Sequence, residues 1–256
     1  MKQNFQIDSF FKPLKLECPI SESDYVNVQS YLKALSAIAR IANMSVYMID
    51  YHKRKEFLYV STNPLFLCGY EVEEVRKMGY DYYPKIFSPE SLTMVLEINE
   101  KGFEYFYSRA PEERINLFIS YDLEIRHKNG HRFMVNHKLT PFALTCDYDM
   151  WLSLCLVTLS TRDKIGNAFI QEFDSSNRLE YSFKSRKWKP APAVALTDRE
   201  REVLQLAALG YTEQGISDKV FIDKTTVKFH KSNILEKLDV NNIIEAVYFA
   251  TVNQLI

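Results

Sequence analysis

The chain has 256 residues, is 46% hydrophobic and carries a formal net charge of −1. This length allows two modest hydrophobic cores. The near-zero charge argues against a protein that binds polyanions or membranes over its whole surface, so any cationic site must be local. The apolar runs are shorter than the ~20 residues needed to span a membrane, and the start MKQNFQIDSF lacks a signal-peptide core. We therefore expect a cytoplasmic protein.

The four cysteines, Cys18, Cys68, Cys146 and Cys155, are scattered through the chain without a CxxC motif or a Cys/His cluster. Zinc sites and disulfide frameworks need closer or more regular spacing. The pattern predicts reduced, mostly buried thiols and no metal site, since free cysteine is among the most buried residue types.

The first clear helix is predicted from Asp24 to Asn43, after an irregular lead. Its apolar residues recur at helical spacing: Val28, Tyr31, Leu32, Leu35, Ile38 and Ala39. Such a stripe fits a helix packed on its own domain and equally a helix that pairs two copies of the chain, because a stripe does not name its partner. Both alternatives stay open.

The next elements are two strands and several helices. Ser45 to Asp50 and Phe57 to Ser61 are rich in β-branched and aromatic residues and predict a hairpin. Asn63-Pro64 and Ser88-Pro89 each place a capping side chain before a proline, which predicts a short helix at LFLCGY and a longer one through Tyr107.

A second hairpin is predicted around Lys128-Asn129-Gly130. A two-residue Asn-Gly turn would set Phe133 opposite Arg126 and mix the apolar and charged faces. With a three-residue loop and a left-handed Gly130, Ile125 faces Phe133, and Leu123 faces Val135, so one face is apolar. The apolar run from Trp151 to Leu159 then predicts a central strand covered on both faces.

Two strands, short helices and three long strands form the element order of a PAS domain, and residues 45–160 resemble one. The resemblance implies a five-stranded antiparallel sheet with helices over one face, and a cavity that senses a ligand or a partner protein. Haem is not expected, because Ser88 to Ser108 contains no histidine. Flavin-adduct chemistry is not expected either, because Cys68 lies on a different predicted helix from the cysteine of flavin-binding light sensors.

Two further features bear on function. His127, His131 and His137 alternate along the second hairpin, and we interpret them as polar residues flanking the loop in preference to a metal or pH-sensing cluster. Residues 161–193 predict a short hairpin followed by a basic linker stiffened by Pro190-Ala191-Pro192. That linker is interpreted as a solvated charge run, with phosphate contact as the alternative.

The stretch from Leu196 to Leu238 contains three successive helix starts. Thr197 and Glu200 form a capping box, Gly210 suits a left-handed stop, and Thr212 and Asp223 are N-cap candidates. This is helix-turn-helix architecture. In the third helix Val227, Ile234 and Leu238 share an inner face, and an outer face is formed by Thr225, Lys228, Phe229, Ser232 and Glu236.

At these residues the chain resembles the LuxR-type DNA-binding domain of bacterial transcription regulators. The resemblance rests on Leu196-Thr197-x-Arg199-Glu200-x-Glu202-Val203-Leu204, Gly210, Ile216, Thr226-Val227-Lys228-x-His230 and Asn233-Ile234-Leu235-x-Lys237-Leu238. It implies a four-helix domain at residues 194–256 whose third helix enters the major groove and whose fourth, roughly Asn242 to Val252, often pairs two domains. Base reading would fall to Lys228, Phe229 and Ser232, and phosphate contacts to Lys224, Thr225, Thr226 and Lys231.

The chain departs from this family at several positions. Gly215 lies inside the second helix at a cost of about 1 kcal/mol relative to alanine. Ser217 replaces a small apolar residue, and Ser232 is short where relatives place a long cation. Asp223 replaces the usual serine cap, and we expect it to cap as well as serine does. The segment is not basic overall, so phosphate attraction must come from a local patch.

Together these patterns predict an α+β protein with four parts: an N-terminal extension and helix (1–44), a PAS-like sensor domain (45–160), a hairpin and linker (161–193) and a helix-turn-helix domain (194–256). The predicted function is that of a dimeric, sequence-specific DNA-binding transcription regulator. No cofactor is evident, and an unidentified PAS ligand or a protein partner would supply the signal. The alternative is a ligand-binding or protein-binding receptor whose C-terminal helices serve only association. Enzymatic motifs and the acidic pair of a phosphorylated receiver are missing from the sequence.

Overall fold

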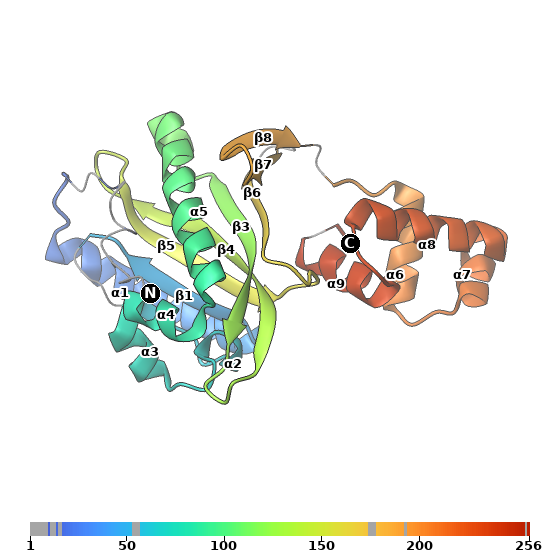
Figure 1. Ribbon diagram of the computed structural model, residues 1–256, viewed down its shortest axis with the longest axis horizontal. Coiled ribbons are helices and arrows are strands. Elements are labelled where there is room, and N and C mark those ends of the chain that lie inside the picture. The colour runs from blue at the N-terminus through green and yellow to red at the C-terminus, as the bar shows by residue number, and fades with distance from the viewer. Residues whose placement is uncertain are drawn as a thin grey trace. The chain divides into compact units, whose positions relative to one another are not determined.

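The structure is a computed structural model of the 256-residue chain, and it describes Phe10, Leu14 and residues 17–52, 57–173, 178–191, 194–253 and 255–256. The chain divides into two compact units, Met1–Ala191 and Pro192–Ile256. Figure 1 shows the first as a sheet with helices and the second as helices alone.

The N-terminal unit contains the elements α1 (Glu22–Ile41), β1 (Ser45–Asp50), β2 (Phe57–Val60), α2 (Pro64–Leu67), α3 (Val72–Met78), η2 (Gly79–Tyr82), α4 (Tyr83–Ile86), α5 (Pro89–Ser108), η3 (Pro111–Glu113), β3 (Leu117–Arg126), β4 (Arg132–Leu144), β5 (Met150–Leu159), β6 (Gly166–Glu172), β7 (Arg178–Ser182) and β8 (Lys187–Ala191). The C-terminal unit contains α6 (Asp198–Ala208), α7 (Glu213–Val220), α8 (Lys224–Leu238) and α9 (Ile243–Val252).

The sheet of the N-terminal unit has the strand order β2-β1-β5-β4-β3-β6-β7-β8. Neighbouring strands are antiparallel. The first five strands form the PAS-like antiparallel sheet that the sequence predicts. The predicted number of strands is wrong, because β6, β7 and β8 extend the sheet to eight.

The added strands occupy the segment that the sequence assigns to a hairpin and a linker. β6 pairs with β3, so it covers an edge that would otherwise present unpaired N–H and C=O groups. Tyr181 in β7 donates to Glu97 Oε1 at 2.7 Å, and the Trp188 indole in β8 donates to the Lys101 carbonyl at 2.9 Å. The expected basic linker around Trp188 is therefore partly a strand fastened to α5.

Local signals in the sequence placed several elements correctly. The side chains of Asn63 and Ser88 cap α2 and α5, each followed by a proline in the first turn. In the β3–β4 hairpin Ile125 pairs with Phe133, and Leu123 with Val135. Gly130 is left-handed with φ +95°. The three-residue loop and its register are confirmed.

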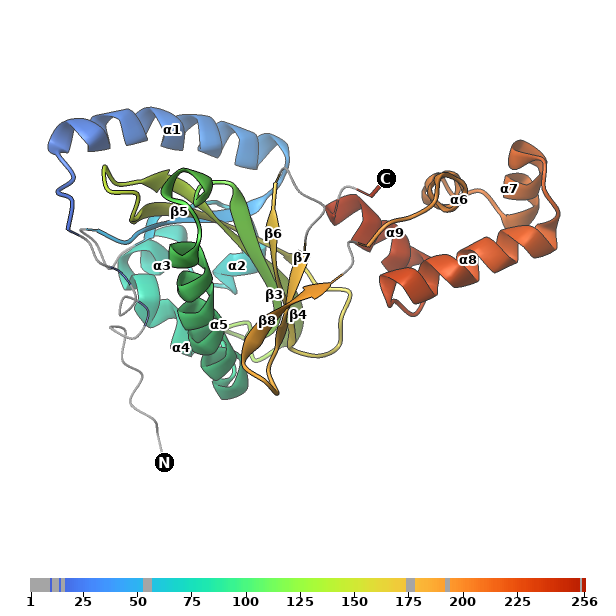
Figure 2. The same ribbon diagram turned by 90° about the horizontal axis from the view of Figure 1, so that it is seen from above.

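Helices cover both faces of the PAS-like part of the sheet (Figures 1 and 2). α2 to α5 pack on the face that carries Tyr47, Leu123 and Cys155. Figure 2 shows α1 along the opposite face, where Tyr25 and Val28 pack against strand residues such as Met48. The prediction that α1 packs on its own domain is confirmed for the side of the helix that carries Tyr25 and Val28.

The remaining side of α1 is exposed, and it carries apolar residues among polar and charged ones. Val26 is 69% exposed, Ile38 57% and Ile41 89%. The alternative role of α1 in pairing two copies therefore stays a prediction.

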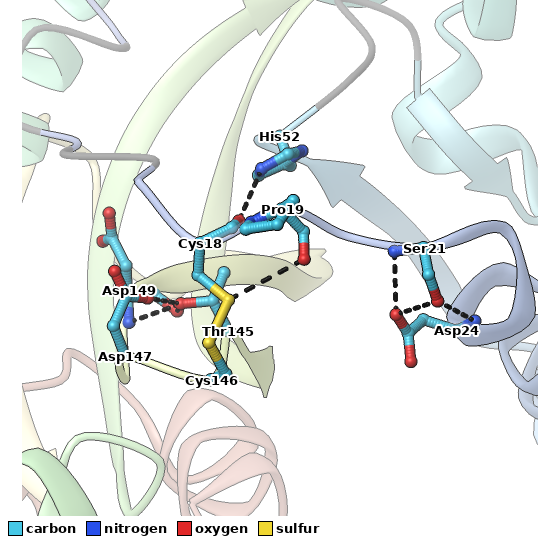
Figure 3. Close-up of a disulfide and its surroundings, with 9 residues drawn as sticks. All are labelled: Cys18, Pro19, Ser21, Asp24, His52, Thr145, Cys146, Asp147 and Asp149. Carbon is cyan, nitrogen blue, oxygen red and sulfur yellow. Dashed lines mark hydrogen bonds between the residues drawn. A yellow bond between two sulfur atoms is a disulfide. The ribbon is translucent and has the colours of Figure 1, made fainter.

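The cysteine prediction is half right. Cys68 and Cys155 are free and buried. Cys18 and Cys146, expected to be reduced, form a disulfide between residues 128 positions apart (Figure 3). The sequence could not reveal this pair, because the turn between β4 and β5 meets the segment before α1 only in the folded unit.

The surroundings of the disulfide anchor the same segment. His52 Nε2 lies 2.9 Å from the Cys18 carbonyl oxygen, and Ser21 and Asp24 form a capping box at the start of α1. The disulfide therefore fixes the chain three residues before the helix cap.

None of the helices in the described ranges combines the length and apolar character that a membrane crossing needs.

Reducing the disulfide should destabilise the N-terminal unit by about 2–5 kcal/mol, because the reduced unfolded chain gains conformational entropy. Urea unfolding followed by tryptophan fluorescence with and without dithiothreitol would measure this. The signal reports this unit alone, since both tryptophans, Trp151 and Trp188, lie in it. The double variant Cys18→Ser/Cys146→Ser is the control, and dithiothreitol should leave its midpoint unchanged. An unchanged wild-type midpoint would contradict the disulfide.

Candidate nucleic-acid interface and buried polar core

Three helices build the frame of the C-terminal unit, and side-chain caps begin two of them, α6 and α7. Thr197 and Glu200 form the predicted capping box at α6, and the Thr212 hydroxyl accepts from the Gly215 N–H at α7. Gly210, after α6, has φ +82°. These local interactions satisfy N–H groups that helix starts leave without partners, so the three helix starts are confirmed.

The inner faces of these helices form one core. Val203 and Leu204 of α6, Ile216 of α7, and Val227 and Ile234 of α8 are each 0% exposed. Burying such side chains stabilises the unit by about 1.5–3 kcal/mol each. The predicted inner face of α8 is confirmed, and the position of this face fixes which residues of α8 point outward.

An ion pair between a partly exposed lysine and a buried glutamate ties α8 to α6. The Lys237 ammonium donates to Glu200 Oε2 at 2.7 Å, and the Thr197 N–H donates to the same oxygen at 2.9 Å. Burial alone would raise the pKa of Glu200, but these hydrogen bonds outweigh it and lower the pKa. The charged carboxylate therefore belongs to the folded domain, with α8 held against the cap of α6.

Two of the four departures from the family, Ser217 and Gly215, have local explanations. The Ser217 hydroxyl donates to the Ile222 carbonyl at 2.6 Å, which ties α7 to the turn before α8. A Cβ at Gly215 would lie 3.3 Å from the Tyr211 ring, so a larger residue would press on that ring. Asp223 occupies the N-cap position of α8 but makes no capping hydrogen bond through its side chain within the described residues. The expectation that Asp223 caps as serine does is wrong.

The predicted base-reading residues lie together on the outer side of α8. Lys228 is exposed over 62% of its side chain, Phe229 is 62% exposed, and Ser232 is exposed. A large apolar ring in water needs a functional reason. Phe221, in the turn before α8, is a second exposed ring at 92%, and sequence reasoning assigned it no role.

The predicted phosphate-contacting residues differ in exposure. Lys224 and Thr225 are exposed at the start of α8, whereas Thr226 and Lys231 are half-buried. Lys231 Nζ lies 3.5 Å from the carboxylate of Glu213, and Lys228 Nζ lies 4.0 Å from it. Sequence reasoning missed Glu213, because the pairing depends on how α7 packs against α8.

A second group of polar side chains lies buried in the PAS-like core. The Tyr47 hydroxyl lies 2.9 Å from the Tyr83 hydroxyl and 2.6 Å from His137 Nε2. His137 is only 4% exposed, so the prediction that it flanks the hairpin loop is wrong. The prediction is right for His127 and His131, where the His127 N–H donates to the His131 carbonyl at 2.8 Å beside the loop.

Burial controls the charge state of this core. It lowers the pKa of His137 to about 3, and it raises the pKa of Tyr47 well above its usual range. Both side chains are therefore neutral near pH 7. His137 Nδ1 has no hydrogen-bond partner among the described residues, so one buried polar atom is left free for a further group.

A small cavity lies between α5 and the sheet, next to these residues. It has a volume of about 50 Å³, and its lining includes Asn99 and Phe103 of α5, Tyr121 of β3, and Tyr51. The Tyr121 ring packs on the His137 ring with centroids 5.0 Å apart. This volume suits a few waters, so a larger molecule would require movement of the aromatic lining.

Comparison with known proteins adds to this geometry. Residues 194–250 match the family model of bacterial regulatory proteins of the luxR family. The C-terminal unit is a LuxR-type helix-turn-helix domain. The matched family consists of transcription regulators and not of enzymes.

Relatives share mainly this LuxR-type domain. The transcriptional regulatory protein DegU of Brevibacillus brevis is 38% identical over 90 residues, which cover 33% of this chain and 38% of DegU. The chain spans less than half the length of the curated relatives it matches first.

Two solved structures match more of the chain at low identity. VqmA of Vibrio cholerae, described as a dimer, is 13% identical, covers 88% of each chain and has a TM-score of 0.34. A PAS domain from Colwellia psychrerythraea is 13% identical, covers 50% of this chain and 96% of that domain, and has a TM-score of 0.37.

The residues that carry the LuxR-type pattern have structural roles here. Glu200 and Lys237 form the ion pair between α6 and α8. Arg199 donates to the Val220 carbonyl at 3.0 Å, which joins α6 to the end of α7. Glu200, Lys237 and Arg199 therefore fix the packing of α6 against α7 and α8.

The stability of the N-terminal unit should fall as the pH is lowered, because the unfolded chain protonates His137 near pH 6.5 while the folded unit resists protonation down to about pH 3. Between pH 7 and pH 5 this one residue should cost about 2 kcal/mol. Urea unfolding by tryptophan fluorescence at both pH values would show the loss. His137→Gln should lose correspondingly less, and equal losses in the two proteins would contradict a neutral buried His137.

Proposed function

We propose that the chain is a dimeric, sequence-specific DNA-binding transcription regulator whose PAS-like domain senses a small molecule. The observation that carries the DNA-binding part is the outer side of α8. It presents a cation, an exposed aromatic ring and a hydroxyl from Lys228, Phe229 and Ser232, on a helix held by a LuxR-type frame. A major groove offers guanine acceptors to lysine and thymine methyls to an apolar ring.

The start of α8 supports contacts to the DNA backbone. Lys224 and Thr225 are exposed there, and Thr226 is half-buried. The first N–H groups of a helix and its dipole favour a phosphate at this end. These contacts would fix the position of the helix in the groove, while Lys228 and Phe229 distinguish bases.

Lys228→Ala and Phe229→Ala should each weaken specific binding by about 1–3 kcal/mol, because each removes a side chain that reads a base edge. The measurement is a titration of the full chain with a duplex that the wild type selects from a randomised pool. Lys77→Ala, on α3 of the other unit, is the matched control, because it removes one exposed positive charge and leaves α8 unchanged. Unchanged affinity and sequence preference in both α8 variants would refute their role in base reading.

Exposed apolar side chains on two helices, α9 and α1, support pairing of two chains. Ile244 on α9 is 78% exposed, and Val26, Ile38 and Ile41 on α1 are exposed as well. A single α8 presents few base-reading groups, so useful specificity needs two half-sites read together. Pairing is therefore part of the proposal.

The sensor part is supported by the buried polar core. Tyr47, Tyr83 and His137 place hydroxyl and imidazole groups inside an otherwise aromatic core, and His137 Nδ1 lacks a partner within the described residues. A small molecule with a hydrogen-bonding group and an apolar ring would complete this environment. Its binding must favour one arrangement of the dimer, since a ligand of equal affinity for two states shifts neither.

Native mass spectrometry of the purified full chain should reveal a retained small molecule, which Tyr47→Phe should bind about tenfold more weakly because it removes the bridging hydroxyl. Tyr59→Phe, on the α1-covered side of the sheet, is the control and should retain the molecule. The small-molecule sensor would be refuted, in favour of a protein signal, by two results together. Every preparation would show the mass of the polypeptide alone, and no compound of a metabolite library would raise the melting temperature.

The alternative is a receptor that uses its C-terminal helices only for association. Binding to duplex DNA that weakens steeply with salt separates the two readings, because phosphate contacts release counterions. The exposed cations of α8 favour DNA.

A further inference from the structure

The carboxylate of Glu213 lies among the cations that the proposed function assigns to DNA. Glu213 is the first residue of α7, and its side chain is 30% exposed. Its oxygens lie 3.5 Å from Lys231 Nζ and 4.0 Å from Lys228 Nζ. One acidic group therefore contacts both a residue proposed to read bases and one proposed to touch phosphate.

The two lysines are held differently. Lys231 keeps 23% of its side chain exposed, whereas Lys228 keeps 62%. The closer and more buried Lys231 is the principal partner, and its charge is largely offset by Glu213. Lys228 remains free to extend toward a ligand, but only from a position beside the carboxylate.

The negative charge of Glu213 is also stabilised by its position at the start of α7. It follows the Thr212 cap at the start of α7, where the helix dipole favours a negative charge. Other acids nearby are engaged elsewhere: Asp218, further along α7, accepts from the Gln214 side chain at 2.8 Å. The carboxylate that faces α8 from α7 is thus that of Glu213.

We propose that Glu213 is a specificity-determining residue, which lowers the affinity of α8 for arbitrary DNA and positions the Lys228 ammonium for base reading. The inference rests on the proposed DNA-binding function and deepens it. Near a phosphate backbone the carboxylate is repelled, and it leaves Lys231 less able to neutralise a phosphate. A correct sequence compensates through contacts of the positioned Lys228, and a wrong sequence does not.

The test compares the wild-type full chain with Glu213→Gln on two 30-base-pair duplexes, one of random sequence and one selected by the wild type. Freeing one cation for a phosphate should steepen the slope of log K against log salt by about 0.9 on the random duplex. Near 0.1 M salt the affinity for that duplex should rise about five- to tenfold. The affinity for the selected duplex should rise less, so that discrimination falls.

Two comparisons separate this effect from a general change in charge or folding. In a Lys231→Gln background, Glu213→Gln should change the salt slope much less, because the cation it would release is gone. Asp218→Asn removes one negative charge from the same helix and should leave discrimination near the wild-type value. Matching circular dichroism melts would show that each variant is folded.

The outcomes are distinct. Loss of discrimination in Glu213→Gln but not in Asp218→Asn supports the proposal. An equal gain on both duplexes, or no change on either, overturns it while leaving DNA binding intact. A wild type that enriches no sequence and binds duplex without salt dependence would instead overturn the proposed function.

Discussion

Strands β1 and β5 are buried on both faces, and this constraint organises the N-terminal unit. Tyr47 and Cys155 are 0% exposed on one face, and Met48 and Leu152 are 0% exposed on the other. Such strands are stable only between two covering layers. α2 to α5 supply one layer and α1 the other, so α1 belongs to the fold even though part of its surface remains exposed. Buried Asp50, which accepts from the Tyr25 hydroxyl at 2.7 Å, links this helix to the end of β1.

The LuxR-type domain uses two glutamates in opposite ways. Glu200 is buried and holds α8 against α6 through Lys237, so its charge serves packing. Glu213 lies at the surface and meets the lysines on the outer side of the same helix. Both positions follow from helix caps, because each acid sits within the first turn after a capping threonine.

Features set by neighbouring residues could be predicted from the sequence. Capping boxes, proline-bearing helix starts and the β3–β4 register each depend on a few adjacent residues, and the structure confirms them. Features set by distant contacts could not: β6 joining β3, the Cys18–Cys146 disulfide and the meeting of Glu213 with α8. The burial of His137 could have been predicted, because His137 alternates in step with Phe133 and Val135 along the strand and therefore shares their inward face.

The ion pair on α8 also bears on how a DNA-binding protein searches for its site, because a lysine that already has a carboxylate partner binds DNA phosphates less strongly. A regulator meets vastly more wrong sites than right ones, so the time it spends bound to wrong sites limits how soon it reaches the right one. Lys231 beside Glu213 offers little to a passing phosphate. Under the proposed roles of α8 and Glu213, such a surface would shorten each unproductive encounter with DNA, so this ion pair would influence how soon the chain, whose overall charge is −1, reaches its site.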